Sequence, residues 1–242
     1  MEQLTPQFSV IIPARNEEEL LSRAIESIRA AASYSNATVE IIVVLNRCTD
    51  STEQVAQSQG ALILVNNEKN LAMIRNTGLK AARGEILVTM DADSQMSKNM
   101  FFEIHRRLAT GKSIGGGVML YPERYSLGII ASILCLVPYS LWHGISAGLF
   151  FSLRRDFIAI GGFNETLLCA EDVDFAKRLK AYGKTQDKKF TTIFNAWIVT
   201  SCRKFDKFGD WYFVSRPLTM LRLLKGKDRR YADMIWYDFP RE

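Results

Sequence analysis

Short runs of apolar residues alternate with segments of helical periodicity over the first ninety residues of the chain. The apolar runs are nearly continuous, which is typical of parallel strands buried on both faces. Between them, apolar residues recur every three or four positions, as on one face of a helix. The expected strands are 8–12, 39–45, 61–65 and 85–90, and the expected helices are 20–28, 50–57 and 70–82. This order predicts a doubly wound α/β domain with a mostly parallel central sheet and flanking helices.

The chain after residue 110 shows the same kinds of pattern less regularly. The expected elements are strands over 113–120 and 147–153, one or two strands over 190–200, and a helix over 171–182. Residues 125–153 contain no Lys, Arg, Asp or Glu and are numerous enough to cross a membrane. Glycines and Pro138 interrupt this stretch, and a membrane span would cut the domain in two. A buried or interfacial helix over 127–142 is therefore the favoured interpretation.

Composition narrows the class of protein. Of the 242 residues, 48% are hydrophobic and 24% are charged, as in ordinary globular proteins. The net charge of +5 suits an anionic ligand or membrane surface and is too small to indicate nucleic acid. The N-terminus lacks the pattern of a signal peptide, so we expect a cytoplasmic protein.

Cysteine and histidine are too sparse for a zinc site. The four cysteines are widely spaced, none lies in a C-x-x-C pair, and only two histidines are present. Reduced thiols in a cytosolic protein are the simpler interpretation. Any metal site must then be built from carboxylates.

Two carboxylates, Asp91 and Asp93, directly follow the apolar run 86–90. At the end of a buried strand they are costly unless something positive lies nearby. A divalent cation with oxygen ligands, Mg²⁺ or Mn²⁺, meets that need and also neutralises a departing diphosphate. The alternative is structural, because Asp93 or Ser94 could cap a helix that begins near Ser97.

Glu171 and Asp172 open the expected helix over 171–182. Acidic residues in a first turn are favoured by the helix dipole, so ordinary capping explains them equally well. The functional alternative is a general base that takes a proton from an attacking hydroxyl group.

Polar residues also follow the first two expected strands. The sequence PARNE at 13–17 lies at the first strand-to-helix turn, and NRCTDST lies at 46–52. These segments could hold a nucleotide, or they could be a plain cap and a polar turn. Arg75 either approaches a diphosphate or is a solvated arginine. All these segments belong to the edge where doubly wound sheets bind ligands.

The order of these segments resembles that of the family 2 glycosyltransferases, which have the GT-A fold. FSVIIPARNEEE is similar to the family's opening strand and turn, and AMIRNTGLKAARGEILVTMDAD to its helix, strand and D-x-D segment. ISAGLFFSLRRDFIAIGGFNE and AEDVDFAKRL are similar to its acceptor-side strand, G-G-F turn and E-D helix. The resemblance covers about residues 8–205.

The resemblance implies a metal-dependent, inverting transfer of a sugar from a nucleotide-sugar to a hydroxyl acceptor. Asp93 would be the principal protein ligand of Mg²⁺ or Mn²⁺, and Asp91 would lie near the ribose or the metal. Asp172 would be the catalytic base, with Glu171 in support. The residues implied at the donor are Pro13, Arg15, Glu17, Asn46, Arg75, Asp91 and Ala92.

The resemblance also suggests how the chain is organised. A single GT-A domain would span 1–226, with a nucleotide-binding part at about 1–110 and an acceptor-binding part at about 111–226. Residues 227–242 would form a basic and aromatic tail, either lying on an anionic membrane surface or solvated and loosely packed. A lipid-linked acceptor or a cell-envelope glycan, and a place at the inner face of the membrane, would suit this tail and the apolar stretch. Arg203 and Lys204 are alternative phosphate contacts.

One departure from the family concerns the donor base. Many members carry two Asp residues where this chain has Leu45-Asn46, and an Asp there can accept a hydrogen bond from the uracil N–H. Asn also accepts through its carbonyl, but it adds donors and lacks the charge. UDP-sugars remain the leading donors. The chain also lacks the family's Q-x-x-R-W motif of processive synthases, which favours transfer of a single sugar.

Two other functions fit an α/β sheet with acidic residues at its edge. A nucleotidyltransferase that makes nucleotide sugars should carry a Gly-rich basic loop near the N-terminus, whereas PARNEEE is acidic and lacks glycine. A non-catalytic sugar- or lipid-binding module has no need of Asp93 and Asp172. The sugar, the acceptor and the oligomeric state are left open by the sequence.

Overall fold

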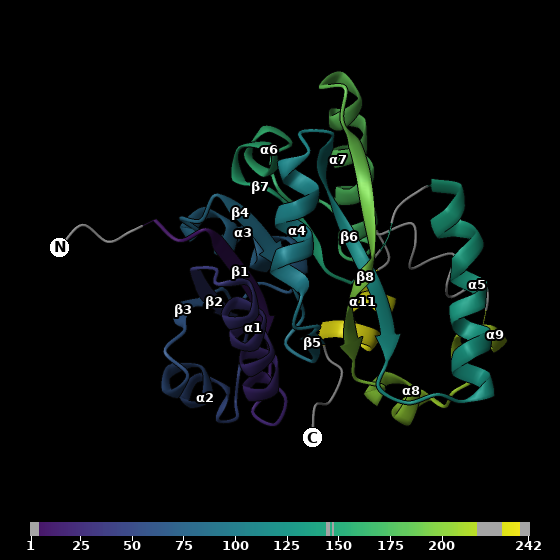
Figure 1. Ribbon diagram of the computed structural model, residues 1–242. Helices are drawn as coiled ribbons and strands as arrows, with labels where there is room; N and C mark the ends of the chain where they lie inside the picture. The colour runs from purple at the N-terminus through teal and green to yellow at the C-terminus, as the bar shows by residue number, and fades with distance from the viewer. Residues whose placement is uncertain (1–4, 144–145, 147, 217–228, 238–242) are drawn as a thin grey trace.

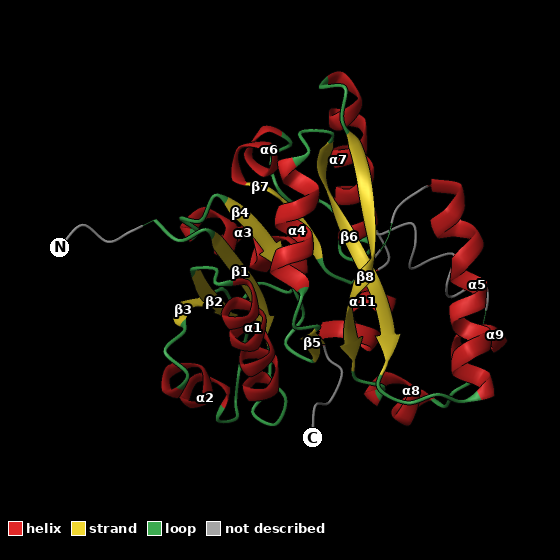
Figure 2. Cartoon of the chain, in the orientation of Figure 1, coloured by secondary structure: helices red, strands yellow, loops and turns green. Residues whose placement is uncertain are grey.

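A single eight-stranded sheet forms the centre of the molecule. The computed structural model describes residues 5–143, 146, 148–216 and 229–237. The strand order is β3-β2-β1-β4-β7-β6-β8-β5, and only β7 and β5 pair antiparallel with their neighbours. Figure 2 shows helices on both sides of this sheet. The α/β class expected from the sequence, with a mostly parallel sheet, is confirmed.

The N-terminal half contains the parallel part of the sheet. Its strands are β1 (Phe8–Ala14), β2 (Val39–Leu45), β3 (Leu62–Val65) and β4 (Ile86–Thr89), and its helices are α1 (Leu21–Ser35), α2 (Thr52–Ser58) and α3 (Leu71–Ala81). Successive residues of β1 enter opposite core clusters, because Val10 and Ile12 pack toward α1 while Ile11 packs toward α3. Burial on both faces is what the continuous apolar runs predict.

The C-terminal half extends the same sheet. Its strands are β5 (Ser94–Met96), β6 (Ser113–Pro122), β7 (Phe150–Leu153) and β8 (Lys189–Thr200). Its longer helices are α4 (Met100–Ala109), α5 (Leu127–His143) and α7 (Glu171–Thr185). The shorter helices are α6 (Arg154–Ala159), α8 (Arg203–Phe208), α9 (Tyr212–Ser215), α11 (Arg229–Ala232) and the π-helical turn η1 (Asp233–Tyr237).

One strand of this half differs from the sequence expectation, and for another the structure decides between the one or two strands expected. The strand expected over 147–153 begins only at Phe150; residue 147 lies outside the described residues, and Gly148 has a φ of +98°, which is incompatible with a strand. Residues 190–200 form one long strand that starts at Lys189. Gly116 permits its close pairing with β6, since a Cβ there would lie 1.7 Å from the Thr191 carbonyl oxygen.

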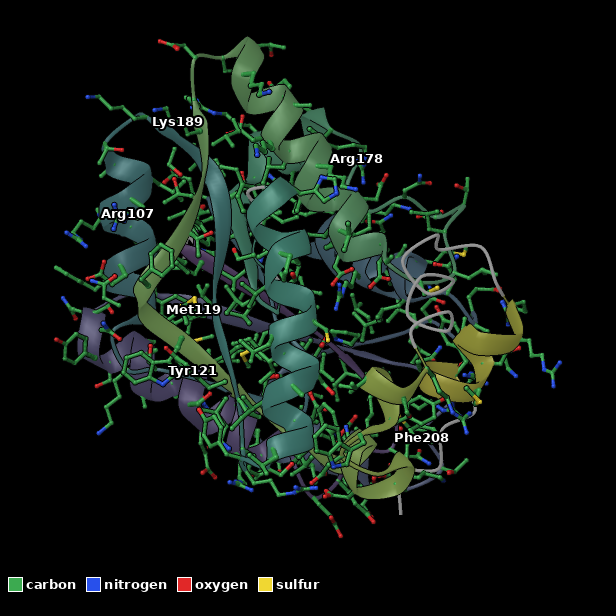
Figure 3. All side chains as sticks on the ribbon, turned by 90° about the vertical axis from the view of Figure 1, so that its right-hand side faces the viewer. Arg107, Met119, Tyr121, Arg178, Lys189 and Phe208 are labelled. Atoms are coloured by element: carbon green, nitrogen blue, oxygen red, sulfur yellow. The ribbon has the colours of Figure 1, made fainter. Side chains whose placement is uncertain are left out.

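Helix α5 stands apart from the sheet layers and packs beside α9 (Figures 1 and 3). Its Ile129 side is buried, whereas Leu127, Ile130, Leu134 and Val137 are exposed. The expected helix over 127–142 is therefore present, buried along one side and open on the other. Within the described ranges, no helix is long and apolar enough to cross a membrane.

Candidate active site

A pocket opens at the carboxyl ends of β1, β2 and β4, where doubly wound sheets bind ligands. Seven residues that the sequence assigned to a donor or metal line it together: Pro13, Arg15, Glu17, Asn46, Asp91, Ala92 and Asp93. The remaining lining residues are Ala14, Leu71, Ile74, Arg203, Lys204 and Tyr237. The pocket therefore combines carboxylates, cations and an apolar side in one place.

Arg75 does not line the pocket but lies buried behind it. Its Nη2 donates to Asp91 Oδ1 at 2.8 Å, and its Nη1 donates to Glu171 Oε1 at 3.1 Å. The side chains of Arg75 and Glu171 are only 6% and 7% exposed, whereas Asp91 is 47% exposed. Arg75 thus ties the D-x-D segment to the start of α7, and the alternative of a solvated arginine is wrong.

Glu171 and Asp172 also lie outside the residues that line the pocket, although Asp91 and Arg75 act on both electrostatically. Burial raises the pKa of Glu171 to about 7, against the opposing effect of Arg75. Burial likewise raises the pKa of Asp172, which Arg75 and the Val173 N–H pull back down. Carboxylates with pKa values shifted toward neutrality are suited to proton transfer.

Asp93 accepts hydrogen bonds from the C-terminal end of β8 and from α8. Ser201 Oγ donates to its Oδ2 at 3.0 Å, and Arg203 Nη2 approaches the same oxygen at 3.2 Å. Arg203 also donates to Glu17 Oε1 at 2.7 Å. Burial alone would raise the pKa of Asp93, but Arg203 and Lys204 hold it below its ordinary value. The carboxylate is therefore ionised at neutral pH.

The capping alternative for Asp93 and Ser94 is wrong. Ser94 lies in the short strand β5, which pairs with β8, and the next helix begins at Met100 after Asn99. The N–H of Ser201 donates to the backbone oxygen of Asp93 at 3.1 Å. The loop that carries Asp93 is thus fixed by a distant strand and not by a helix cap.

The side-chain amide of Asn46 has a defined orientation. Its Nδ2 donates to the backbone oxygens of Asn66 and Glu68 at 2.7 and 2.8 Å. Its Oδ1 accepts a bond from Arg47 Nε at 3.3 Å. Both amide protons are therefore used within the protein, and the carbonyl oxygen retains a second lone pair.

Tyr237 is the pocket residue that sequence reasoning assigned elsewhere, to the tail over 227–242. It is 4% exposed and packs in a cluster with Cys169 and Ala232. Burial raises the pKa of its hydroxyl group to about 12, so the group stays protonated at neutral pH. Its aromatic character and basic neighbours gave no signal that distinguishes a pocket wall from a membrane anchor.

The sheet and the pocket at its strand ends define an α/β domain of the GT-A class. Residues 9–126 match the model of the family described as Glycosyl transferase family 2. The matched part of the chain, which is just under half of its length and contains the pocket residues from Pro13 to Asp93, belongs to this family. The separate nucleotidyltransferase and binding-module interpretations have no comparable support.

Similar proteins share parts of this chain. It is 22% identical over 209 residues to the O-antigen biosynthesis protein RfbC of Myxococcus xanthus, covering 74% of this chain and 16% of that protein. It is 32% identical over 103 residues to the uncharacterized glycosyltransferase EpsJ of Bacillus subtilis (strain 168), covering 40% of this chain and 29% of that protein. The chain thus aligns with less than a third of the length of these curated relatives.

Solved structures show the same fold at low sequence identity. S. aureus TarS 1–349 in complex with UDP-GlcNAc superposes with a TM-score of 0.64 at 18% identity, covering 96% of this chain and 71% of that one. Glucosyl-3-phosphoglycerate synthase from Mycobacterium tuberculosis, in complex with Mn²⁺, UDP and phosphoglyceric acid, gives 0.59 at 18% identity, covering 93% and 80%. At this identity the likeness extends to the fold alone.

Proposed function

We propose that this protein is a metal-dependent, inverting glycosyltransferase that moves a single sugar from a UDP-sugar to a hydroxyl acceptor. The observation that carries the proposal is the pocket, where Asp91 and Asp93 face Arg203 and Lys204 at the ends of buried strands. Such a mixture of signs suits a diphosphate together with a cation. The two ligand-bound structures named above, although related only by fold, hold a UDP-sugar and UDP with Mn²⁺.

The oxygen ligands that the pocket offers suit a cation that takes most of its other ligands from the nucleotide. Within the residues that the structure describes, no group of three or more His, Cys, Asp or Glu side chains could hold a metal ion alone. Asp93, with Asp91 beside it, supplies the hard oxygen ligands that Mg²⁺ and Mn²⁺ prefer. When bound, the cation neutralises the charge that develops on the departing diphosphate.

The orientation of Asn46 favours uracil as the base. Its amide protons are held by two backbone oxygens, so only its carbonyl oxygen is left for a ligand. A carbonyl oxygen accepts from the N3–H of uracil, whereas cytosine presents an acceptor at that position. Asn46 would thus play the part for which many family members use Asp.

Asp172 is the proposed catalytic base. It would take the proton of the acceptor hydroxyl while that oxygen attacks the anomeric carbon. The bond from this carbon to the diphosphate breaks, and its electron pair leaves with the diphosphate. Arg75 positions Asp91 and Glu171, the residue next to Asp172, since it bonds to both carboxylates.

The exposed side of α5 supports a lipid-linked acceptor and peripheral membrane contact. Leu127, Ile130, Leu134 and Val137 recur at intervals of three and four residues and are between 39% and 78% exposed. Apolar side chains aligned along one helix face are typical of helices that lie on a membrane surface. Placement at the inner face of the membrane would give the pocket access to such an acceptor.

A thermal-shift experiment tests the donor assignment. UDP, GDP, CDP and dTDP would each be added with Mn²⁺ or with a chelator. Saturating UDP with Mn²⁺ should raise Tm by about 5–10 °C, since binding at 100 Kd adds about 2.7 kcal/mol. The rise should vanish with chelator and in Asp93→Asn, but persist in the exposed control Asp187→Asn. No shift with any nucleotide would overturn the proposal.

A further inference from the structure

The C-terminal segment Arg229–Tyr237, formed by α11 and η1, is attached to the rest of the chain through Tyr237. The Tyr237 hydroxyl accepts from the Leu71 N–H and donates to the Leu168 oxygen, both at 2.8 Å. Arg47 Nη2 donates to the Tyr237 backbone oxygen at 2.9 Å. These three partners come from the loop after β2, the start of α3 and the loop before α7. One residue therefore connects three segments, of which the loop after β2 and the start of α3 line the pocket through Asn46 and Leu71.

The Tyr237 ring is covered by Arg229, a residue of the same segment. The Arg229 guanidinium lies 5.5 Å from the ring centroid, in a position suited to a cation–π contact. Arg229 is itself held, by Asp233 and by the Lys69 backbone oxygen at 3.0 Å. Arg229 does not line the pocket, whereas Tyr237 does. Tyr237 is only 4% exposed, and it reaches the pocket with the small part of its side chain that its neighbours do not cover.

Tyr237 lies at the nucleoside end of the pocket. Arg47 connects it to Asn46, because the same guanidinium reaches the Asn46 Oδ1 and the Tyr237 oxygen. The phosphate end is marked by Asp93 and Arg203, which are paired with each other. The apolar side chain of Leu71 lines the pocket next to the Tyr237 hydroxyl. An aromatic ring, an apolar side chain and an amide carbonyl are the groups that a planar base needs.

We propose that Tyr237 is a donor-binding residue, whose ring forms the wall against which the nucleoside of the donor packs. The segment 229–237 is then part of the donor site, and nucleotide binding and docking of the segment stabilise each other. This inference rests on the proposed function, because it takes a nucleoside diphosphate as the occupant of the pocket. By linkage, whatever strengthens docking must also strengthen binding.

The test compares nucleotide affinity and segment protection in the full chain. Titration calorimetry with UDP and Mn²⁺ should give a Kd raised about 5- to 150-fold in Tyr237→Ala, the range measured for removing an aromatic ring from a stacked base. Tyr237→Phe keeps the ring and should lose much less. Tyr34→Ala, a 63% exposed tyrosine on α1, is the matched control and should bind as the unaltered protein does.

Hydrogen exchange separates a binding role from a structural one. UDP with Mn²⁺ should slow amide exchange over 229–237 in the unaltered protein and leave it unchanged in Tyr237→Ala. If Tyr237→Ala does not fold, Tyr237→Leu retains apolar volume without the planar ring and should show the same loss of affinity. Unaltered affinity in the Ala or Leu variant, or exchange over 229–237 unaffected by UDP, overturns the inference alone. An unaltered protein that binds no nucleoside diphosphate overturns the proposed function itself.

Discussion

Replacement of Arg75 by Met should be among the most destabilising single changes in this chain. The substitution leaves the Glu171 carboxylate, 7% exposed, without its partner at 3.1 Å. Removing one member of a buried ion pair costs about 3–5 kcal/mol, because the other charge stays buried. The Asp91 contact adds about 1 kcal/mol at most, since Asp91 is 47% exposed. Most of the lost stability should therefore come from the unpaired Glu171 carboxylate.

The pH dependence of this loss has a defined sign. In the folded protein burial raises the pKa of Glu171 to about 7, above its ordinary value of 4.5. Because folding raises this carboxyl pKa, the protonated Glu171 side chain contributes its full stability below pH 4.5, and this contribution is lost as the pH rises through 7. Arg75 lowers this pKa, so its removal raises the value further. The deficit of Arg75→Met should therefore be larger at pH 8 than at pH 5.5.

Equilibrium urea denaturation followed by circular dichroism measures these free energies of unfolding. Arg75→Met/Glu171→Gln should recover a large part of the loss, because the buried Glu171 charge is then removed together with its partner. Arg23→Met, at a surface pair with Glu123 that is 51% and 47% exposed, should change stability by about 0.5 kcal/mol or less. A deficit below about 1 kcal/mol at pH 8, or equal deficits at both pH values, would refute the reasoning.

Two further predictions concern turnover and membrane contact. Asp172→Asn should lower kcat by about 100- to 10,000-fold while leaving the UDP Kd unchanged, since a base acts in the chemical step; unchanged turnover would remove Asp172 from that role. The double variant Leu127→Glu/Leu134→Glu should lower co-sedimentation with phosphatidylcholine–phosphatidylglycerol vesicles by about tenfold or more. The control variant Phe102→Glu, at an exposed position on α4, should co-sediment as the unaltered protein does. An equal loss in both variants would contradict membrane contact through α5.

The parallel half of the sheet could be predicted from the sequence, because the local pattern of apolar residues determines where its strands lie. A strand buried on both faces is apolar at nearly every position, and β1 and β2 are, apart from Ser9 and Glu40, which bond to each other. The pocket residues Pro13, Asn46 and Asp93 follow directly, since they lie just after such strands. Position along the chain is enough to place them at one edge.

The rest of the site depends on contacts between distant residues. The strand β5 is only Ser94–Met96, and its pairing with β8 decides that it is a strand at all. Arg75 and Glu171 are 96 positions apart, and Arg47 and Tyr237 are 190 apart. No local periodicity reports such pairs. Tyr237 therefore appeared as one aromatic residue of a basic tail.

The continuity of the sheet restricts how this protein can admit its substrates. Hydrogen-bonded strands follow one another without interruption from β3 to β5, so the predicted nucleotide-binding and acceptor-binding parts belong to one continuous sheet. A hinge between them would have to break the ladder that joins β4 to β7. Opening must instead come from peripheral pieces that slide or lift, as in enzymes gated by loops. The rates of substrate entry and product exit would then depend on motions at the edges of the molecule, while the carboxylates proposed for catalysis keep their positions.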